Sequence, residues 1–341
     1  MAAQAVSPGG TARLFQMSSA AILQQSLYAA ARLGIADLLN AGVRTVSCLA
    51  TYLQVDEQAL LRVMRFLASQ GVFEENVRGA FANNELSDHL RSGVQGSLRA
   101  FVIMRGSHMF FAPCGEILYC IETGRSAREK LSGKDSFEQL KEDPEMARIF
   151  DDAMSNLSEW MSRAIASAYD FGAWGTLMDV GGGHGVLLAA ILEAHPGLHG
   201  VLADLPAVIG RAEERGYLAG ALKRRSTLRS CDFFQEIPIG CRAYLMKNVI
   251  HDWDDERALE ILVNCRRAVP DDGVLLLAQW TIPDISLPSA GRFMDIAMLV
   301  LTGGRERVVD EYGELLSRAG FKLNQVFPVP GEFSIIEALP V

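Results

Sequence analysis

A glycine-rich turn between a short apolar segment and an apolar helix constrains this chain of 341 residues more than any other feature. The segment Leu177–Val186 reads LMDVGGGHGV. Its apolar start predicts a buried strand that ends at Asp179, and the run Val186–Leu192 predicts the helix. Glycine suits a turn at which the backbone approaches a ligand, because a Cβ atom would block the approach. A strand, a glycine turn and a helix form the unit at which open α/β sheets bind nucleotide-like ligands.

The spacing of the glycines indicates which kind of nucleotide binds. A dinucleotide fingerprint has glycines at its first, third and sixth positions, whereas the sixth position counted from Gly181 is Val186. The turn also lacks the lysine and the Ser/Thr of a P-loop, so we expect an adenosine-bearing ligand without phosphates. Asp204, about 20 residues downstream at the end of the next predicted strand, suits the ribose hydroxyls. Its alternative role is a turn or helix N-cap residue before Leu205 and Pro206.

Composition and charge argue against several classes of protein. Hydrophobic residues make up 49% of the chain, but the longest apolar run is far shorter than the about 20 residues that span a membrane. The N-terminus lacks the features of a secretory signal, and the six cysteines are scattered without zinc-site spacing, so we expect a cytoplasmic protein with reduced thiols. The net charge is −9 and the first hundred residues are nearly neutral, which argues against a nucleic-acid partner.

The first half of the chain is predicted to be mainly helical, after a loose tail over residues 1–12. Apolar residues recur at helical spacing through several segments, and two short segments separated by a turn predict a β-hairpin. Helix, helix and hairpin in this order are typical of a winged helix. The expected helices cover 18–39, 46–50, 57–69, 98–121 and 137–167, and the hairpin strands cover 72–75 and 79–81.

From Gly175 the pattern changes to alternating strands and helices, which predicts a parallel sheet with helices on both faces. The fold class is therefore α/β, with a separate helical N-terminal domain. We expect a winged-helix-like domain (1–100), a helical substrate-lining region (101–170) and a ligand-binding domain (171–341). The expected strands cover 177–180, 200–203, 243–246, 273–279 and 333–338, and helices at 254–268 and 309–319 stand among them.

Three further segments carry candidate site residues. Asp232 and Phe233 in CDFF suit the exocyclic amine and the face of adenine, or alternatively form a strand end with core phenylalanines. The segment YLMKNVIHDWDD places His251 after a predicted parallel strand, at the edge where ligands bind, and its alternative role is a helix cap. Trp253 lines the adenine pocket or belongs to the core. Glu306 follows the two glycines of GGRER, which give a flexible approach, and by itself reads as a solvated, salt-bridging acid.

The order of these motifs closely resembles that of the plant-type small-molecule O-methyltransferases and their bacterial relatives, over nearly the whole chain. DVGGGHG is followed by ADLP, CDFF, KNVIHDWDD and GGRER. The resemblance implies a Rossmann-like class I fold that uses S-adenosylmethionine, and a homodimer formed by a winged-helix N-terminal domain. It also implies that His251 is the catalytic base and that Glu306 orients it. The cofactor-binding residues that it implies are Gly181, Gly183, Asp204, Leu205, Asp232, Phe233, Lys247 and Trp253.

The sequence departs from the family pattern at three positions. Gln279 stands where the family often has a second acid beside the histidine, and an amide cannot balance the charge of an imidazolium. Val308 replaces a common threonine and removes a helix N-cap, for which Asp310 is a candidate substitute. Phe233 replaces a common methionine, and its ring is expected to stack on the base at least as well.

The sequence thus predicts metal-independent methylation of a hydroxyl, expected to be phenolic, on a small aromatic or polycyclic secondary metabolite. A neutral histidine removes the hydroxyl proton, and no cluster of carboxylates indicates bound Mg²⁺. Two alternatives stay open: a family member that binds the cofactor but catalyses hydroxylation, decarboxylation or cyclisation, and a winged-helix regulator. The candidate acceptor residues, for which core packing is an equal alternative, are Met104, Phe111, Met154, Met294 and Met298, together with Phe110, Trp160 and Phe293.

Overall fold

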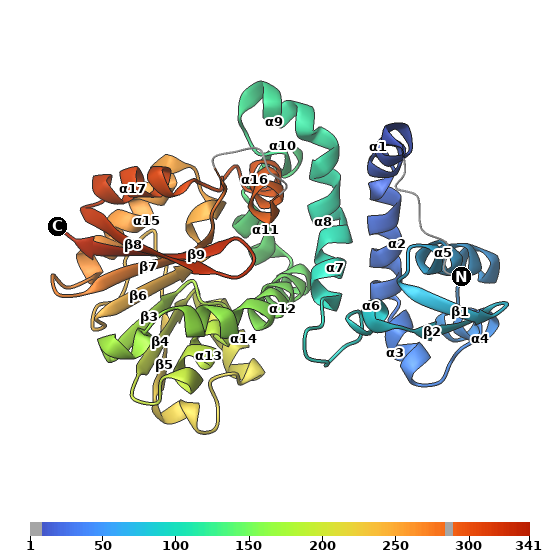
Figure 1. Ribbon diagram of the computed structural model, residues 1–341, viewed down its shortest axis with the longest axis horizontal. Coiled ribbons are helices and arrows are strands. Elements are labelled where there is room, and N and C mark those ends of the chain that lie inside the picture. The colour runs from blue at the N-terminus through green and yellow to red at the C-terminus, as the bar shows by residue number, and fades with distance from the viewer. Residues whose placement is uncertain (1–8, 284–288) are drawn as a thin grey trace. The chain divides into compact units, whose positions relative to one another are not determined.

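The computed structural model of the protein describes residues 9–283 and 289–341. The chain forms two compact units that divide between Phe111 and Ala112 (Figure 1). The predicted boundary at residue 100 falls inside helix α7 (Arg99–Gly106), which packs against α2 (Ala20–Arg32) and therefore belongs to the first unit. The predicted division of the remaining chain at residue 170 stays a prediction.

The first unit consists of helices and one antiparallel ribbon, β1–β2. The prediction of a loose tail is wrong from Gly10 onward, where α1 begins, and residues 1–8 lie outside the described residues. The helix predicted over 18–39 is interrupted at Gly34, which has a left-handed φ of +67°. The elements are α1 (Gly10–Ser18), α2, α3 (Ile35–Asn40), α4 (Val46–Leu53), α5 (Glu57–Ser69), β1 (Phe73–Val77), β2 (Ala80–Asn83), α6 (Glu85–Asp88), α7 and α8 (His108–Phe111).

The order of α4, α5 and the ribbon is the one that the winged-helix interpretation requires, and the winged helix itself stays a prediction. Helices α2 and α7 pack closely because Gly106 has no side chain. A Cβ atom at Gly106 would lie 2.3 Å from Cβ of Tyr28. Two glutamines of α2 donate to the C-terminal carbonyls of α7, Gln24 to Arg105 at 2.6 Å and Gln25 to Gly106 at 3.1 Å. These bonds satisfy carbonyls that a helix end leaves without partners.

Both long helices predicted before the sheet of the second unit are divided in the structure, although the last of the resulting helices is itself long. The helix predicted over 98–121 is interrupted at Ser107, and after α8 the chain passes through a 3₁₀ turn with Pro113 before α-helix resumes at Ile117. The helix predicted over 137–167 is divided at Asp143, whose carboxylate caps a new helix that starts with Pro144. In the described part of the chain, no helix is both long and apolar enough to cross a membrane. The helices are α9 (Ile117–Thr123), α10 (Ala127–Ser132), α11 (Ser136–Glu142) and α12 (Pro144–Ala168).

A seven-stranded sheet with the order β5-β4-β3-β6-β7-β9-β8 forms the centre of the second unit. The prediction of an all-parallel sheet is wrong for β9, which runs antiparallel to β7 because it forms a hairpin with β8. Strands β5 and β8 were not predicted; β5 is a short, polar edge strand. The strands are β3 (Thr176–Val180), β4 (His199–Asp204), β5 (Ser226–Ser230), β6 (Ala243–Lys247), β7 (Val274–Trp280), β8 (Phe321–Val329) and β9 (Phe333–Pro340).

Alternate residues of the central strands pack against helices on opposite faces of the sheet (Figure 1). Leu177 and Leu245 face the helices α12, α13 and α14, whereas Met178 and Met246 face α15 and α17. The strands β3, β4, β6 and β7 pair in parallel, so their carboxyl ends lie at one edge of the sheet. This is the edge where ligands bind in open α/β sheets. The remaining helices are α13 (Val186–Ala194), α14 (Pro206–Arg215), α15 (Asp255–Ala268), α16 (Ala290–Leu301) and α17 (Val309–Arg318).

We predict that Gly106→Ala destabilises the first unit by about 1–3 kcal/mol, because the added methyl group forces α2 and α7 apart. Denaturant unfolding monitored by circular dichroism measures the change. Gly10→Ala is the matched control, since a Cβ atom there meets nothing within 4 Å. Equal stability of both variants would contradict the packing described for the two helices.

Candidate active site

The glycine turn after β3 combines left-handed backbone with a close approach to its neighbours. Gly181 and Gly183 have φ of +70° and +60°, a region that other residues adopt only with strain. A Cβ atom at Gly183 would meet nothing within 4 Å, so this part of the turn leaves its backbone accessible. A Cβ atom at Gly182, which was not predicted as a site residue, would lie 2.5 Å from Leu202 and 2.6 Å from the carboxylate of Asp179.

Asp204 lies at the end of β4 and holds the glycine turn through its carboxylate. Oδ2 accepts the N–H of Gly183 at 2.8 Å, and Oδ1 accepts the N–H of Leu205 at 2.7 Å. Burial raises the pKa of Asp204 to about 6, although both backbone donors lower it. The N-cap of α14 is Leu205, which provides no side-chain hydrogen bond, so the alternative role of Asp204 as the helix cap is wrong. The carboxylate instead stands at the sheet edge beside the turn.

His184 ties the glycine turn to α12, a function that the sequence did not reveal. Its buried Nδ1 lies 2.8 Å from the hydroxyl of Ser155, and Nε2 lies 3.6 Å from the carboxylate of Asp151. Arg211 of α14 pairs with the same carboxylate. The turn is thereby connected to α12 directly and to α14 through Asp151.

An aromatic cluster follows β5 and β6. Trp253 stacks on Phe137 with ring centroids 5.4 Å apart and meets Phe234 edge to face at 4.6 Å. Phe233 belongs to the same cluster and would lie 3.7 Å from a Cβ atom at Gly181, so it borders the glycine turn. Phe137 lies on α11 and was missed, because no sequence pattern connects it with the other rings.

Asp232 is engaged in the turn that follows β5. Its carboxylate accepts the N–H of Phe234 at 3.1 Å and the side-chain amide of Gln235 at 2.9 Å. The alternative interpretation of CDFF as a strand end with core phenylalanines does not fit, because β5 ends at Ser230 and Phe233 and Phe234 are only partly buried. Binding of adenine by Asp232 and Phe233 stays a prediction.

His251 and Glu306 form a buried pair. His251 Nδ1 lies 2.6 Å from Glu306 Oε1, and the two residues are only 5% and 1% exposed. Burial lowers the pKa of His251, but the carboxylates of Glu306 and Asp252 raise it by more, so the net shift is upward. The cap of α15 is Asp254, which accepts the N–H of Arg257, so the alternative role of His251 as a helix cap is wrong. The alternative of a solvated Glu306 is also wrong.

Asp179 and Lys247 are buried at the same edge and attract each other electrostatically, and only Lys247 was predicted as a site residue. Burial raises the pKa of Asp179 to about 7, against the attraction of Lys247, and lowers the pKa of Lys247 to about 8, against the attraction of Asp179. Neither oxygen of Asp179 has a hydrogen-bond partner among the described residues. Its position as the last polar residue before the glycine turn was the signal that could have identified it.

Buried polar atoms without a hydrogen-bond partner are found along this edge of the described structure. They belong to Asp179, Asn248, Trp253, Gln279 and Glu306. The amide of Gln279 is fully buried, and neither its nitrogen nor its oxygen is bonded within the described chain. Because native proteins rarely leave buried polar groups unsatisfied, this concentration indicates a place where a polar ligand completes the bonding.

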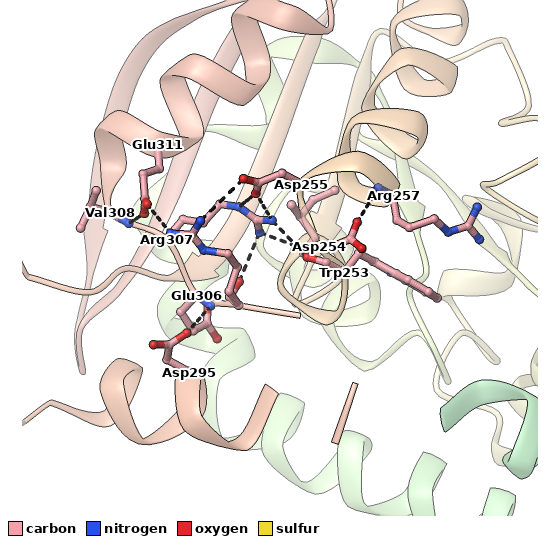
Figure 2. A network of polar contacts seen from close by, with 11 residues as sticks. Trp253, Asp254, Asp255, Arg257, Asp295, Glu306, Arg307, Val308 and Glu311 are labelled. Carbon is pink, nitrogen blue, oxygen red and sulfur yellow. Dashed lines mark hydrogen bonds and ion pairs between the residues drawn. The ribbon is translucent and has the colours of Figure 1, made fainter. Parts of the chain in front are cut away.

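The segment Gly303–Arg307 lies directly against the turn that carries His251. A Cβ atom at Gly304 would lie 2.1 Å from the carbonyl oxygen of His251, so this glycine serves close approach rather than the expected flexibility. The N–H of Arg305 donates to that carbonyl at 2.9 Å. The N–H of Glu306 donates to Asp295 of α16 at 3.0 Å (Figure 2). These contacts hold the carboxylate of Glu306 beside the imidazole.

The candidate acceptor residues fall into two groups. Met154 lies half-buried on α12, and Met294 and Met298 lie on α16, all within the second unit. Trp160 and Phe293 are 64% and 65% exposed, so they are not core residues. The remaining candidates belong to the first unit, and their part in binding an acceptor, like that of the whole set, stays a prediction. They are Met104, Phe110 and Phe111.

Val308 is the N-cap of α17, and its side chain makes no capping bond. Asp310, the candidate substitute for the N-cap, lies inside α17 instead, and the N–H of Val308 donates to Glu311 Oε2 at 3.0 Å (Figure 2). The helix therefore keeps one half of a capping box without the threonine.

Among the described residues, no three His, Cys, Asp or Glu side chains form a group suited to hold a metal ion.

We predict that Glu306→Gln lowers the pKa of His251 by about one unit or more, because the amide keeps an acceptor but removes the negative charge beside the imidazolium. NMR titration of the His251 ring protons measures this pKa. Glu311→Gln is the matched control, because Glu311 lies nearby but bonds Val308 and Arg305 instead. An unchanged His251 pKa in Glu306→Gln would contradict the coupling.

Comparisons with known proteins agree with this geometry. Residues 118–322 match the model of the O-methyltransferase domain, and residues 15–92 match that of the O-methyltransferase dimerisation domain. The chain is 39% identical to the phenazine O-methyltransferase PhzM of Lysobacter antibioticus, over 96% of each chain. It is 32% identical to a phenazine-1-carboxylate N-methyltransferase of Pseudomonas aeruginosa, over 95% of this chain and 96% of the relative.

The solved structure of a relative contains a bound cofactor. An O-methyltransferase from neocarzinostatin biosynthesis, crystallised with S-adenosylmethionine and 2-hydroxy-5-methyl naphthoic acid, matches 94% of this chain and 96% of its own. Its TM-score is 0.82 at 32% identity. The accessible turn at Gly183, the carboxylate of Asp204 and the unsatisfied polar edge fit an adenosine-bearing cofactor of this kind. The chain therefore belongs to the O-methyltransferase family, and it is an enzyme that uses S-adenosylmethionine.

Proposed function

We propose that this enzyme methylates a hydroxyl, phenolic in character, on a small aromatic or polycyclic secondary metabolite, with His251 as the general base. The observation that carries the proposal is the buried contact between His251 Nδ1 and Glu306 Oε1 at the ligand-binding edge of the sheet. Relatives named for phenazine and naphthoic acid substrates support an aromatic acceptor. The methionines Met154, Met294 and Met298 add polarizable surface that suits flat rings.

The contact with Glu306 sets the role of each imidazole nitrogen. A carboxylate only accepts hydrogen bonds, so the proton of the neutral ring stays on Nδ1 and Nε2 keeps its lone pair. Nε2 then takes the proton of the acceptor hydroxyl, and the carboxylate of Glu306 stabilises the imidazolium that forms. S-Adenosylmethionine, when bound, supplies an electrophilic methyl group. A general base typically accelerates a reaction about 10²–10⁴-fold. Holding the reactants in a fixed geometry can lower the barrier by about 7–11 kcal/mol.

The residues proposed to hold the cofactor border the glycine turn. Asp204 would accept the ribose hydroxyls, which requires the carboxylate to bond them in addition to its two backbone donors. Phe233 and Trp253 would face the base, and Lys247 would lie beside polar groups of the cofactor. The proposed set is completed by Gly181, Gly183, Leu205 and Asp232.

We further propose that catalysis is metal-independent, since the base already has its own orienting carboxylate and the hydroxyl needs no Lewis acid to lose its proton to it. The enzyme would act in the cytoplasm, a proposal that rests on its six free cysteines. Nucleic acid and membrane are not among its proposed partners.

A second candidate function is cofactor-dependent chemistry without methyl transfer, such as hydroxylation, decarboxylation or cyclisation. The observation that favours it is Gln279, a neutral and unsatisfied amide at full burial. Incubation with S-adenosylmethionine labelled in the methyl group distinguishes the two functions, because the label reaches the product only in methyl transfer.

We predict that His251→Gln lowers kcat about 10²–10⁴-fold for hydroxyl acceptors, because a glutamine amide cannot take the hydroxyl proton that the imidazole is proposed to remove. Turnover of phenols and hydroxynaphthoates, with EDTA present, measures kcat, and calorimetry with S-adenosylhomocysteine verifies that the cofactor site is intact. The label and a panel that includes non-aromatic alcohols define the acceptor class. Turnover at the wild-type rate in the variant would exclude His251 as the base.

We propose that the first unit forms a homodimer with a second copy of this chain. It matches a dimerisation domain. Its helix α1 has no buried residue, and the apolar side chains of Leu14, Phe15 and Met17 are 64–71% exposed. Exposed apolar side chains of this density mark an interaction surface.

We predict that Phe15→Glu weakens the dimer, because it places a charge on the apolar surface of α1. Sedimentation equilibrium measures the monomer–dimer constant. Gln16→Glu, on the same exposed helix, is the charge-matched control and should leave the constant within about twofold. A monomeric wild-type protein at micromolar concentration would contradict the dimer.

A further inference from the structure

A buried guanidinium lies between the two segments that form the proposed base. Arg307 is 1% exposed and is among the largest fully buried side chains in the described structure. It donates to Asp255 Oδ1 from Nε at 3.0 Å and from one terminal nitrogen at 2.7 Å. It also donates to the carbonyl oxygens of Ile250 at 3.3 Å and Arg305 at 3.2 Å, and to that of Trp253 at 3.0 Å, whose place beside Arg307 and Asp255 Figure 2 shows.

Two of these carbonyls flank the proposed base. Ile250 precedes His251 in a short 3₁₀ turn, and Trp253 follows that turn, so Arg307 holds the backbone on both sides of the imidazole. The preceding residues, Arg305 and Glu306, bind the carbonyl and the side chain of His251 itself. Three consecutive residues therefore contact one turn, each through a different chemical group.

Both partners of the Arg307–Asp255 pair belong to regular structure. Asp255 begins α15, whose N-cap bond is already supplied by Asp254, so the carboxylate of Asp255 serves Arg307 and Arg305 instead. The segment of Arg307 is fixed to the sheet by a parallel bridge to Thr281, which follows β7. Arg307 therefore joins the turn of His251 to a helix start and to a strand end.

We infer that Arg307 is a positioning residue for proton removal: by holding residues 250–253 against 305–307, it keeps the imidazole of His251 at hydrogen-bond distance from Glu306. The inference rests on the proposed function for its catalytic meaning. The planar guanidinium is needed because a carboxylate and three carbonyls lie around it in different directions. A lysine ammonium keeps the charge but is a compact group on a flexible stem, and it cannot reach all of them.

Several charged groups surround His251 and Arg307. His251 is influenced by Glu306, by Asp252 on its own turn and by Lys247 of β6. Besides its own partner Asp255, Arg307 has neighbours in Arg305 and the buried Tyr312 of α17. Substitution of Arg307 by lysine leaves all these charges in number unchanged. A change in the titration of His251 would therefore report a change in its distance from Glu306.

The decisive experiment is an NMR titration of His251 in Arg307→Lys, with S-adenosylhomocysteine bound and the signal assigned through His251→Gln. We expect the pKa of His251 to fall, since the carboxylate that raises it moves away. In parallel, we expect kcat with 1,4-dihydroxy-2-naphthoic acid to fall about 10²-fold, as small displacements of catalytic groups do. The dissociation constant of S-adenosylhomocysteine should change much less than kcat, since Asp204 and the glycine turn keep their contacts and only Trp253 stands on the turn that Arg307 holds.

Arg266→Lys is the matched control. Arg266 also binds backbone carbonyls, those of Gly320 and Val269, and an aspartate, Asp271, but at the opposite end of α15. It should lose thermal stability without any change in the His251 pKa. If Arg307→Lys behaves in the same way, Arg307 is merely structural and the inference is overturned.

Two further variants separate a failure to fold from a failure of positioning. If Arg307→Lys does not fold, Asp255→Asn weakens the same tether from its half-exposed end and should lower the His251 pKa in the same direction; no change there would also overturn the inference. If His251→Gln retains turnover, the proposed function fails, whereas the titration still decides whether Arg307 positions His251.

Discussion

The contact between His251 Nδ1 and Glu306 Oε1 is the interaction on which the site depends. It joins residues 55 positions apart in the sequence, and both are almost fully buried. A carboxylate placed there is stable only with a partner, and an imidazole placed there has one nitrogen committed as a donor. Gly304 permits the two segments to meet, and Arg307 holds them together. The glycine turn and the buried polar groups of the same edge lie around this pair.

Polar groups along the same edge are arranged for ligands rather than for stability. The carboxylate of Asp179 and the amide of Gln279 are buried without hydrogen-bond partners in the described chain, an arrangement that disfavours folding. Natural proteins retain such groups mainly at functional sites. The glycine turn shows the same principle in its backbone, because Gly181 and Gly183 adopt left-handed conformations that keep the turn tight and its amides close to Asp204. The fold and the proposed cofactor site thus share the same residues.

Periodicity predicted β3, β4, β6 and β7 because strands that are buried on both faces are apolar throughout. It missed β5 and β8, which lie at the edges of the sheet and carry many exposed or polar residues. Glu306 alone indicated a solvated acid, and only the resemblance to a family assigned its role. Phe137, Arg307 and the close approach of Gly304 could not be predicted, because their partners lie far away in the sequence and come together only in the folded chain.

The tautomer of His251 decides whether this histidine can act as the base. Nitrogen-15 NMR of the histidine ring, recorded above the pKa of His251 with S-adenosylhomocysteine bound, distinguishes a protonated nitrogen from one with a free lone pair. We expect a proton on Nδ1, held by Glu306, and an unprotonated Nε2 able to receive the proton of the acceptor. A proton on Nε2 in the neutral ring would contradict it, since that ring would have no lone pair on the nitrogen assigned to accept a proton.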